Sequence, residues 1–297
     1  MTTTKEVRIE ISTHCNYRCI FCPHKNGFNR KKEIMSDDLF FKIINKIKQI
    51  PRINTITLSG MGEAFTDKNI LNKVKYCKDN GYIVNLLTNG SLLTPQIVDE
   101  LYKLKVDSIR ISLHTLDKEE YKQITGADLD NVEFILDYIY KTKTVTRLIV
   151  SSDIVNDKQS IEELKKYSEF ADVEIWKPHN WINWATYRQG ERVEKTCGRP
   201  FNGPIQIQVD GTINMCCFDY NGELEIGDFK TQTIDEIFNS DMYLKIKHFH
   251  EGNDSDILCS KCDQLYKKDQ SILIYSNTNV SGRIYKTSTN YEKISGE

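Results

Sequence analysis

Short apolar runs alternate with helix-like segments from residue 7 to residue 178, and this alternation constrains the fold. Such a pattern is typical of parallel βα units, in which a helix returns the chain to the start of the next strand. It predicts strands at 7–12, 53–59, 82–88, 108–113, 147–152 and 173–178. It also predicts a helix after Ser36 and helices near 67–79, 95–104, 117–124, 130–142 and 160–169, with Thr94-Pro95 and Ser160 as start signals.

Six strands that alternate with helices predict an α/β fold, a partial (β/α)6 barrel similar to an open TIM barrel. Right-handed crossovers place the loops that follow the strands on one rim, where parallel α/β folds build their sites. We expect the barrel to occupy residues 1–190, a smaller domain with a β-hairpin and a helix to occupy 191–270, and a tail to occupy 271–297.

The charged residues nearly balance, with 40 Lys and Arg against 42 Asp and Glu and a net charge of -2. Bulk electrostatics therefore favours neither nucleic acid nor an anionic membrane as a partner. The start of the chain lacks the apolar stretch of a secretory signal, and no uncharged run approaches the roughly 18 residues that span a bilayer. We expect a cytoplasmic protein. In that reducing compartment its nine cysteines are expected to be metal ligands or free thiols, in preference to disulfides.

Three cysteines follow the first expected strand with the spacing C-x3-C-x2-C, namely Cys15, Cys19 and Cys22. Cysteine thiolates hold iron-sulfur clusters, and a cubane cluster normally takes four of them. Three thiolates on one short loop therefore predict an iron that is open to a substrate or cofactor. The alternatives are a disulfide pair or a zinc site that includes His14 or His24, although zinc pairs usually run C-x2-C with a second pair following.

This motif, with Phe21 in the aromatic position before the third cysteine, resembles the radical S-adenosylmethionine (SAM) enzymes. The resemblance implies that Cys15, Cys19 and Cys22 ligate a 4Fe-4S cluster whose open iron is chelated by SAM. It implies reductive cleavage of SAM to methionine and a 5'-deoxyadenosyl radical that abstracts hydrogen from carbon. It also implies an external one-electron reductant such as flavodoxin or ferredoxin.

Polar and glycine-rich segments at the ends of the next strands are suited to hold SAM. Residues 59–64 read Ser-Gly-Met-Gly-Glu-Ala, where glycines let the backbone approach a ligand closely. In the family this segment corresponds to a G-G-E-P motif, from which Met61 and Ala64 depart. Alone, each glycine cluster is an ordinary turn. Together with Phe21, the expected cofactor-binding residues are Gly60, Met61, Gly62, Glu63, Asn89, Ser112 and His114, the last standing where an acid is commoner.

A second set of cysteines lies in the carboxyl-terminal third, at Cys197, Cys216, Cys259 and Cys262. Apolar residues alternate on both sides of Asp210-Gly211, which predicts a hairpin with a two-residue turn that brings Cys197 and Cys216 together. Cys259 and Cys262 would join them after a helical stretch over 234–249. A four-cysteine zinc ribbon is an alternative for such a set.

The pattern C-x13-G-x4-C with a late C-x2-C resembles the SPASM and twitch extensions of radical SAM enzymes. A full SPASM domain carries seven ligand cysteines and two auxiliary clusters, whereas this chain offers enough thiols for one. We therefore predict one auxiliary 4Fe-4S cluster, fully ligated by protein, and two clusters in total.

Several other side chains are candidates for catalysis or packing. His179 lies beyond the sixth strand and could act as a general base. Cys217 could donate a hydrogen atom beside the auxiliary cluster or be a buried thiol, and Asp219 could carry a proton or be solvated. Trp176 and Trp184 could wall a pocket or pack the domain junction, and Cys77 is expected in the core. His248 and His250 are expected on a solvated helix without a role.

Two substrate classes fit these features. A single auxiliary cluster resembles the arrangement in twitch enzymes such as 2-deoxy-scyllo-inosamine dehydrogenase, which implies oxidation or epimerisation of a small hydroxylated molecule, a sugar, cyclitol or aminoglycoside. The alternative is a peptide maturase that crosslinks or epimerises residues, although the 14 residues before Cys15 are few for a leader-binding domain. An iron-sulfur carrier is disfavoured because a carrier gains nothing from an open iron.

Overall fold

A computed structural model describes residues 3–142, 148–153, 167, 170–176, 178–182, 184–266 and 273–275. Six parallel strands stand side by side in chain order, which confirms the predicted partial (β/α)6 barrel. They are β1 (Glu6–Ile9), β2 (Thr55–Leu58), β3 (Ile83–Thr88), β4 (Ser108–Ser112), β5 (Leu148–Asp153) and β6 (Asp172–Trp176). Each overlaps one of the strands that the sequence predicts.

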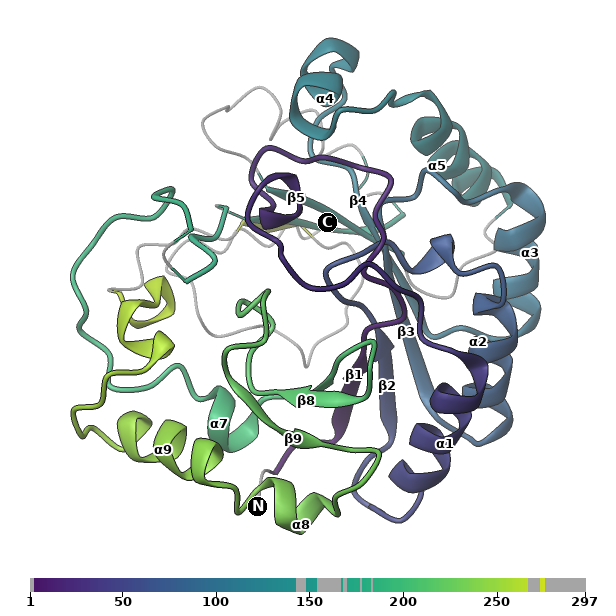
Figure 1. The fold of residues 1–297 in the computed structure, drawn as a ribbon. Coiled ribbons are helices and arrows are strands. Elements are labelled where there is room, and N and C mark those ends of the chain that lie inside the picture. The colour runs from purple at the N-terminus through teal and green to yellow at the C-terminus, as the bar shows by residue number, and fades with distance from the viewer. Residues whose placement is uncertain are drawn as a thin grey trace, which may run out of the picture.

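The helices that connect these strands lie along one side of the sheet, where Figure 1 shows α1, α2, α3 and α5. Ser36 and Thr94 each cap a helix, since their side chains accept hydrogen bonds from the backbone N–H groups of Leu39 and Ile97. The expected helix near 160–169 and its start signal Ser160 lie outside the described residues. The helices are α1 (Asp37–Ile47), α2 (Ile70–Asp79), α3 (Pro95–Lys103), α4 (Lys118–Thr125) and α5 (Asp130–Thr142).

The two faces of the sheet differ in polarity because successive strand residues point to opposite faces. The face toward the helices is apolar, and its side chains are at most 1% exposed: Val7, Ile9, Ile56, Leu58, Val84, Leu86, Ile109 and Ile111. Most of the alternate positions carry polar side chains on the inner, concave face, with Leu87 as an exception. We call these the polar row: Glu6, Arg8, Thr57, Asn85, Ser108, Arg110 and Glu174.

The carboxyl-terminal part continues the same sheet beyond β1. Strand β7 (Ile205–Ile207) pairs in parallel with β1, and β8 (Thr212–Asn214) and β9 (Glu225–Asp228) follow antiparallel. At the other edge, β10 (Leu273–Tyr275) pairs antiparallel with β6. The remaining elements are η1 (Pro23–Lys25), η2 (Ala64–Thr66), α7 (Arg199–Asn202), α8 (Ile234–Ile237), α9 (Asp241–His250), η4 (Leu258–Lys261) and η5 (Asp263–Leu265).

Two local expectations in this part were wrong. The hairpin turn has three residues, because Gln208 N–H donates to the Thr212 carbonyl and Gly211 takes a positive φ of 90° in the left-handed region. The expected helix over 234–249 is two helices, because the Ser240 side chain caps a new helix by accepting from Tyr243 N–H. Among the described residues, no helix combines the length and apolarity needed to cross a membrane.

A buried ion pair joins α2 to the segment before it. The Lys73 side chain is 1% exposed, and its amine donates to Asp67 at 2.6 Å and also to Asp37 at the start of α1. Because the amine and the Asp67 carboxylate have both lost water, removal of one partner would leave a buried charge without compensation.

We expect Lys73→Met to lower the free energy of unfolding by about 3–5 kcal/mol, the usual cost of breaking a buried pair from one side. Lys75→Met is the matched control, because Lys75 pairs with Asp79 at 2.6 Å on the exposed side of the same helix. An exposed pair contributes about 0.3–0.5 kcal/mol. Urea titration followed by circular dichroism measures the free energy of unfolding of both variants. Equal losses of that free energy would contradict the stabilising role of the buried pair.

Candidate functional site

The cysteine loop lies at the carboxyl end of β1 and is held by the end of α4. Arg18 N–H donates to the Thr125 carbonyl and Ile20 N–H to the Ile124 carbonyl, both at 2.8 Å. Within the loop, Cys22 N–H donates to the Cys19 carbonyl at 3.1 Å. Cys15, Cys19 and Cys22 are all partly exposed. The loop is therefore fixed by backbone hydrogen bonds while its thiols remain accessible.

The predicted SAM segment packs directly against this loop. Gly62 N–H donates to the Ser12 carbonyl at 3.1 Å, and Glu63 N–H donates to the His14 carbonyl at 2.7 Å. A Cβ atom on Gly62 would lie 2.3 Å from the Ser12 oxygen and 2.4 Å from the His14 oxygen. Only glycine permits this approach, so the second glycine of the motif sets the position of the backbone that leads into Cys15.

Glu63 joins the same segment to the end of β3. Its buried carboxylate accepts hydrogen bonds from Thr88 Oγ1 at 2.8 Å, Asn89 N–H at 2.7 Å and Phe65 N–H at 3.0 Å. Burial raises the pKa of Glu63, and these hydrogen bonds oppose the rise. The Asn89 amide in turn donates to Asn16 Oδ1 at 2.9 Å. The ends of β2 and β3 and the cysteine loop therefore form one hydrogen-bonded unit.

Phe21 and His114 meet on the other side of the loop. Their ring centroids are 4.9 Å apart in an edge-on arrangement, and Trp181 Nε1 donates to the Phe21 carbonyl at 2.8 Å. Burial lowers the pKa of His114 to about 4, so its imidazole is neutral near pH 7. Ser112 is partly exposed at the end of β4. The predicted cofactor-binding residues thus lie on the strand-end rim around the cysteine loop, and their contact with SAM stays a prediction.

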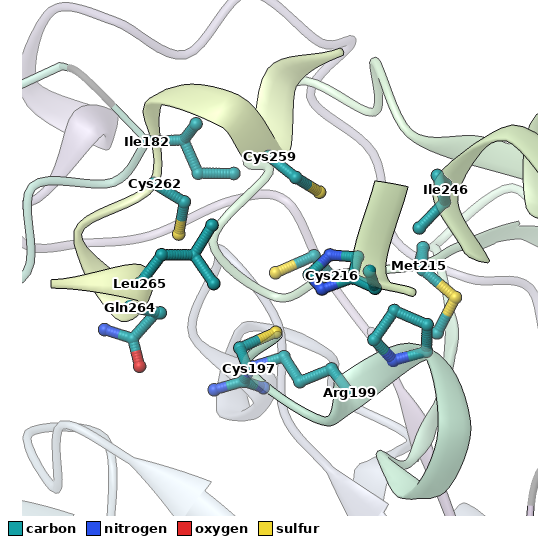
Figure 2. Close-up of a pocket in the computed structure, with 12 residues that line it drawn as sticks. Ile182, Cys197, Arg199, Met215, Cys216, Ile246, Cys259, Cys262, Gln264 and Leu265 are labelled. Atoms are coloured by element: carbon teal, nitrogen blue, oxygen red, sulfur yellow. The ribbon is translucent and has the colours of Figure 1, made fainter. Parts of the chain in front are cut away.

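The four cysteines of the second set line one cavity. Figure 2 shows Cys197, Cys216, Cys259 and Cys262 pointing toward the same space, although they come from three segments of the chain. Cys197 precedes α7, Cys216 follows β8, and the other two lie in and after η4. The hairpin and the late C-x2-C therefore converge as the sequence predicts.

The donor set of this cavity fits an iron-sulfur cluster. Burial raises the pKa values of Cys259 and Cys262 to about 12, so these thiols must lose protons when they bind metal. Each thiolate of a cubane binds a different iron, and the four cysteines that line this cavity supply the four thiolates that such a cluster takes.

Three further side chains line this cavity and have no role in the sequence-based prediction: Arg199, His250 and Gln264. His250 was expected on a solvated helix, but it is 4% exposed and its Nδ1 lies 3.0 Å from Thr196 Oγ1. The helical spacing of Tyr243, Ile246, Phe249 and His250 on one buried face could have revealed this. Cys77 is fully buried in the core, as predicted.

The three predicted catalytic residues lie in different environments. Burial, followed by the charges of Arg188 and Arg199, lowers the pKa of His179 to about 2, which makes its imidazole a weak base. The Asp219 carboxylate accepts from Gly222 N–H at 3.0 Å and Leu224 N–H at 2.6 Å, so it stabilises a turn. Cys217 Sγ accepts from Arg199 Nη1 at 3.2 Å and lies within electrostatic range of Arg8 in the polar row.

The tryptophans that were expected to wall a pocket or pack the domain junction lie partly within the described residues. Trp181 stands edge-on to Phe218 with centroids 6.0 Å apart, and His179 lies 4.3 Å from the same ring. Trp184 lies against Gly27 of the loop after η1, where a Cβ atom would be 2.6 Å from the indole nitrogen. These indoles therefore connect the segment after β6 to the cysteine loop. The side chain of Trp176 lies outside the described residues.

The chain belongs to the radical SAM superfamily, whose sequence family matches residues 9–171. The iron-sulfur cluster-binding SPASM domain family matches residues 197–263, which contain the four cavity cysteines. The protein is therefore a radical SAM enzyme with a SPASM domain, and its cofactors are SAM, the SAM-binding 4Fe-4S cluster and auxiliary iron-sulfur. That a single auxiliary cluster is present stays a prediction, as do the domain boundaries.

One relative and two solved structures show what the chain is similar to. The "uncharacterized protein MJ0804" of Methanocaldococcus jannaschii is 31% identical over 206 residues, which are 67% of this chain and 64% of that relative. The structure of BtrN in complex with AdoMet and 2-DOIA has a TM-score of 0.59 and 17% identity, covering 88% of this chain and 91% of BtrN. Streptococcus suis SuiB bound to precursor peptide SuiA has a TM-score of 0.66 and 16% identity, covering 88% and 70%. At these identities the two structures share the fold.

We expect the anaerobically reconstituted protein to hold two 4Fe-4S clusters, about eight irons per chain. Replacing Cys15, Cys19 and Cys22 with alanine should halve the iron content and abolish SAM cleavage. Replacing Cys259 and Cys262 should also halve the iron content but leave SAM cleavage measurable. Cys77→Ala is the control and should retain both clusters. Iron near one cluster in the wild type would overturn the assignment of two cysteine sets to two clusters.

Proposed function

We propose that the protein oxidises or epimerises a carbon of a small hydroxylated molecule such as a sugar, cyclitol or aminoglycoside. The bound cluster and SAM supply a 5'-deoxyadenosyl radical that abstracts hydrogen from that carbon, after one electron from an external reductant such as flavodoxin or ferredoxin. The observation that supports this substrate class is the polar row on the concave face of the sheet.

Hydrogen bonds connect the polar row from strand to strand. Thr57 Oγ1 donates to Glu6 at 2.8 Å, Asn85 donates to Thr57 Oγ1 at 3.4 Å, and Ser108 Oγ donates to Asn85 at 2.6 Å. Thr57, Asn85 and Ser108 are direct neighbours in the sheet register, and Glu6 lies diagonal to Thr57, so these side chains form a continuous surface. Such a surface offers both donors and acceptors, which is what a molecule with several hydroxyl groups requires.

The charges of the polar row are paired. Arg8 bonds Glu6 at 2.9 Å, and Arg110 bonds Glu174 at 2.6 Å, so the two cations are matched by two anions. A surface with balanced charge favours neither a strongly anionic nor a strongly cationic substrate. This supports a neutral hydroxylated molecule, or one with few charged groups.

Cys217 is the predicted catalytic residue whose surroundings suit a role best. Arg8 lies on the concave face and Arg199 lies at the cysteine cavity, and both are within electrostatic range of the Cys217 thiol. A thiol at this junction could return a hydrogen atom to a substrate radical, which epimerisation requires and oxidation does not. His179 and Asp219 are weaker candidates because one is hard to protonate and the other bonds backbone amides.

The comparisons support both substrate classes in part. BtrN was solved with AdoMet and 2-DOIA, and this chain covers 91% of it. SuiB was solved with its precursor peptide SuiA, and its TM-score is the higher of the two. A peptide substrate, with crosslinking or epimerisation of its residues, is therefore the competing class, and the assay below separates the two.

The reconstituted enzyme should form 5'-deoxyadenosine faster with aminocyclitols or aminoglycoside precursors than without substrate. Deuterium at the reacting carbon of the substrate should appear in 5'-deoxyadenosine by mass spectrometry. Asn85→Leu should raise KM about 10-fold, since the loss of one hydrogen bond costs about 1.4 kcal/mol. Tyr102→Ala, at a 53% exposed position on α3, is the control and should leave KM unchanged. Stimulation by peptides alone would overturn the proposed class.

The role of Cys217 separates the two chemical outcomes. If its thiol returns a hydrogen atom, solvent deuterium should enter the wild-type product at the abstracted carbon, because thiols exchange with water. Cys217→Ala should then still form 5'-deoxyadenosine but lose the epimerised product. Normal product from Cys217→Ala, without deuterium in the wild-type product, would favour oxidation instead.

A further inference from the structure

Arg199 stands at the wall of the cysteine cavity. It begins α7, two residues after Cys197, and Figure 2 shows its side chain beside that cysteine. Its Nη1 donates to Cys217 Sγ at 3.2 Å, and its guanidinium stacks over the Phe218 ring at 4.6 Å from the centroid. The cation is therefore held on two sides and lies next to the space that the four cysteines enclose.

The guanidinium has no carboxylate partner within the part of the chain that the structure describes. Three other partly or fully buried arginines do have one, although Arg52 has none among the described residues: Arg30 bonds Glu10 at 2.5 Å, Arg110 bonds Glu174 at 2.6 Å, and Arg188 lies 3.4 Å from Asp263. A desolvated cation without a counter-charge is costly, and arginine does not lose its proton to avoid that cost.

The nearby sulfurs supply the missing negative charge. Arg199 lines the cavity together with Cys197, Cys216, Cys259 and Cys262, and it bonds the neighbouring Cys217 sulfur directly. The four cavity cysteines become thiolates when they ligate a cluster. A cubane bound by four thiolates is an anion, and the potential of such a cluster depends on nearby charge and on hydrogen bonds to its sulfurs.

We propose that Arg199 is the counter-charge of the auxiliary cluster and raises its reduction potential. Reduction adds one negative charge to the cluster, and a cation close to its ligand sulfurs stabilises the reduced form more than the oxidised form. Arg199 would act through the cluster, so it is a positioning and electrostatic residue.

The consequence of a higher reduction potential for the reaction rests on the proposed function. When an alcohol becomes a carbonyl, the carbon loses a hydrogen atom to the 5'-deoxyadenosyl radical, and the resulting radical must release one electron and the hydroxyl proton. A cluster held by Cys197, Cys216, Cys259 and Cys262 would supply an acceptor for that electron, and the proton would pass to water. A higher potential makes the cluster a better acceptor. The potential itself can be measured without any substrate, so its test does not depend on which reaction the enzyme performs.

The experiment uses the full chain with Cys15, Cys19 and Cys22 replaced by alanine, so that the auxiliary cluster alone is observed. Arg199→Met should make reduction at least tenfold less favourable, which is about 59 mV more negative for a one-electron couple. Arg199→Lys keeps the charge and should shift the potential less. A redox titration followed by electron paramagnetic resonance measures each midpoint, and iron content reports loading.

Arg192→Met is the matched control, because Arg192 stacks over Phe249 at 4.4 Å but is exposed and does not line the cavity. The midpoint reduction potential of its cluster should equal that of the chain in which only Cys15, Cys19 and Cys22 are replaced. If the Arg199→Met variant binds the cluster and its midpoint reduction potential is unchanged, the proposal is overturned. If Arg199→Met fails to load iron, Arg199→Gln replaces it. If Arg199→Lys binds iron but Arg199→Met and Arg199→Gln do not, the result supports a role of Arg199 as counter-charge. If none of the three variants binds iron, the proposal is overturned in favour of a packing role for Arg199.

Discussion

The site depends on the close contact between two backbone segments, residues 12–14 after β1 and residues 60–63 after β2. Gly62 and Glu63 donate their N–H groups to the Ser12 and His14 carbonyls, and a side chain on Gly62 would separate the strands' ends. The Glu63 carboxylate extends the contact to β3. Since Cys15 follows immediately, this contact determines where the first thiol lies relative to the SAM segment.

The two metal sites are joined through one sheet. Strand β7 pairs with β1, so the hairpin that carries Cys216 and Cys217 is anchored to the same strand that leads to the cysteine loop. Arg8 on β1 lies within electrostatic range of Cys217, and Arg199 at the cavity donates a hydrogen bond to the same sulfur at 3.2 Å. A shared sheet fixes the separation of the two cysteine sets, because its strands are held in register by backbone hydrogen bonds.

Much of the local structure was readable from the sequence because it depends on short-range rules. The period of the apolar residues and the caps at Ser36 and Thr94 located the strands and helices to within a few residues. The errors arose where two local signals competed. Ser240 starts a new helix inside an apolar pattern that continues across it, and Gly211 adds a residue to the turn that Asp210-Gly211 suggested.

The sequence by itself determined the fold class and the two cysteine sets, because strand-helix alternation and thiol spacing are local properties of the chain. The cofactors followed from the family resemblance that those motifs carry. The tertiary structure decided which side chains surround those cysteines. Arg199 lacks a carboxylate partner among the described residues, His250 is buried, His179 is hard to protonate and Asp219 caps a turn. Each of these facts follows from desolvation and from partners distant in sequence, which no spacing along the chain reveals.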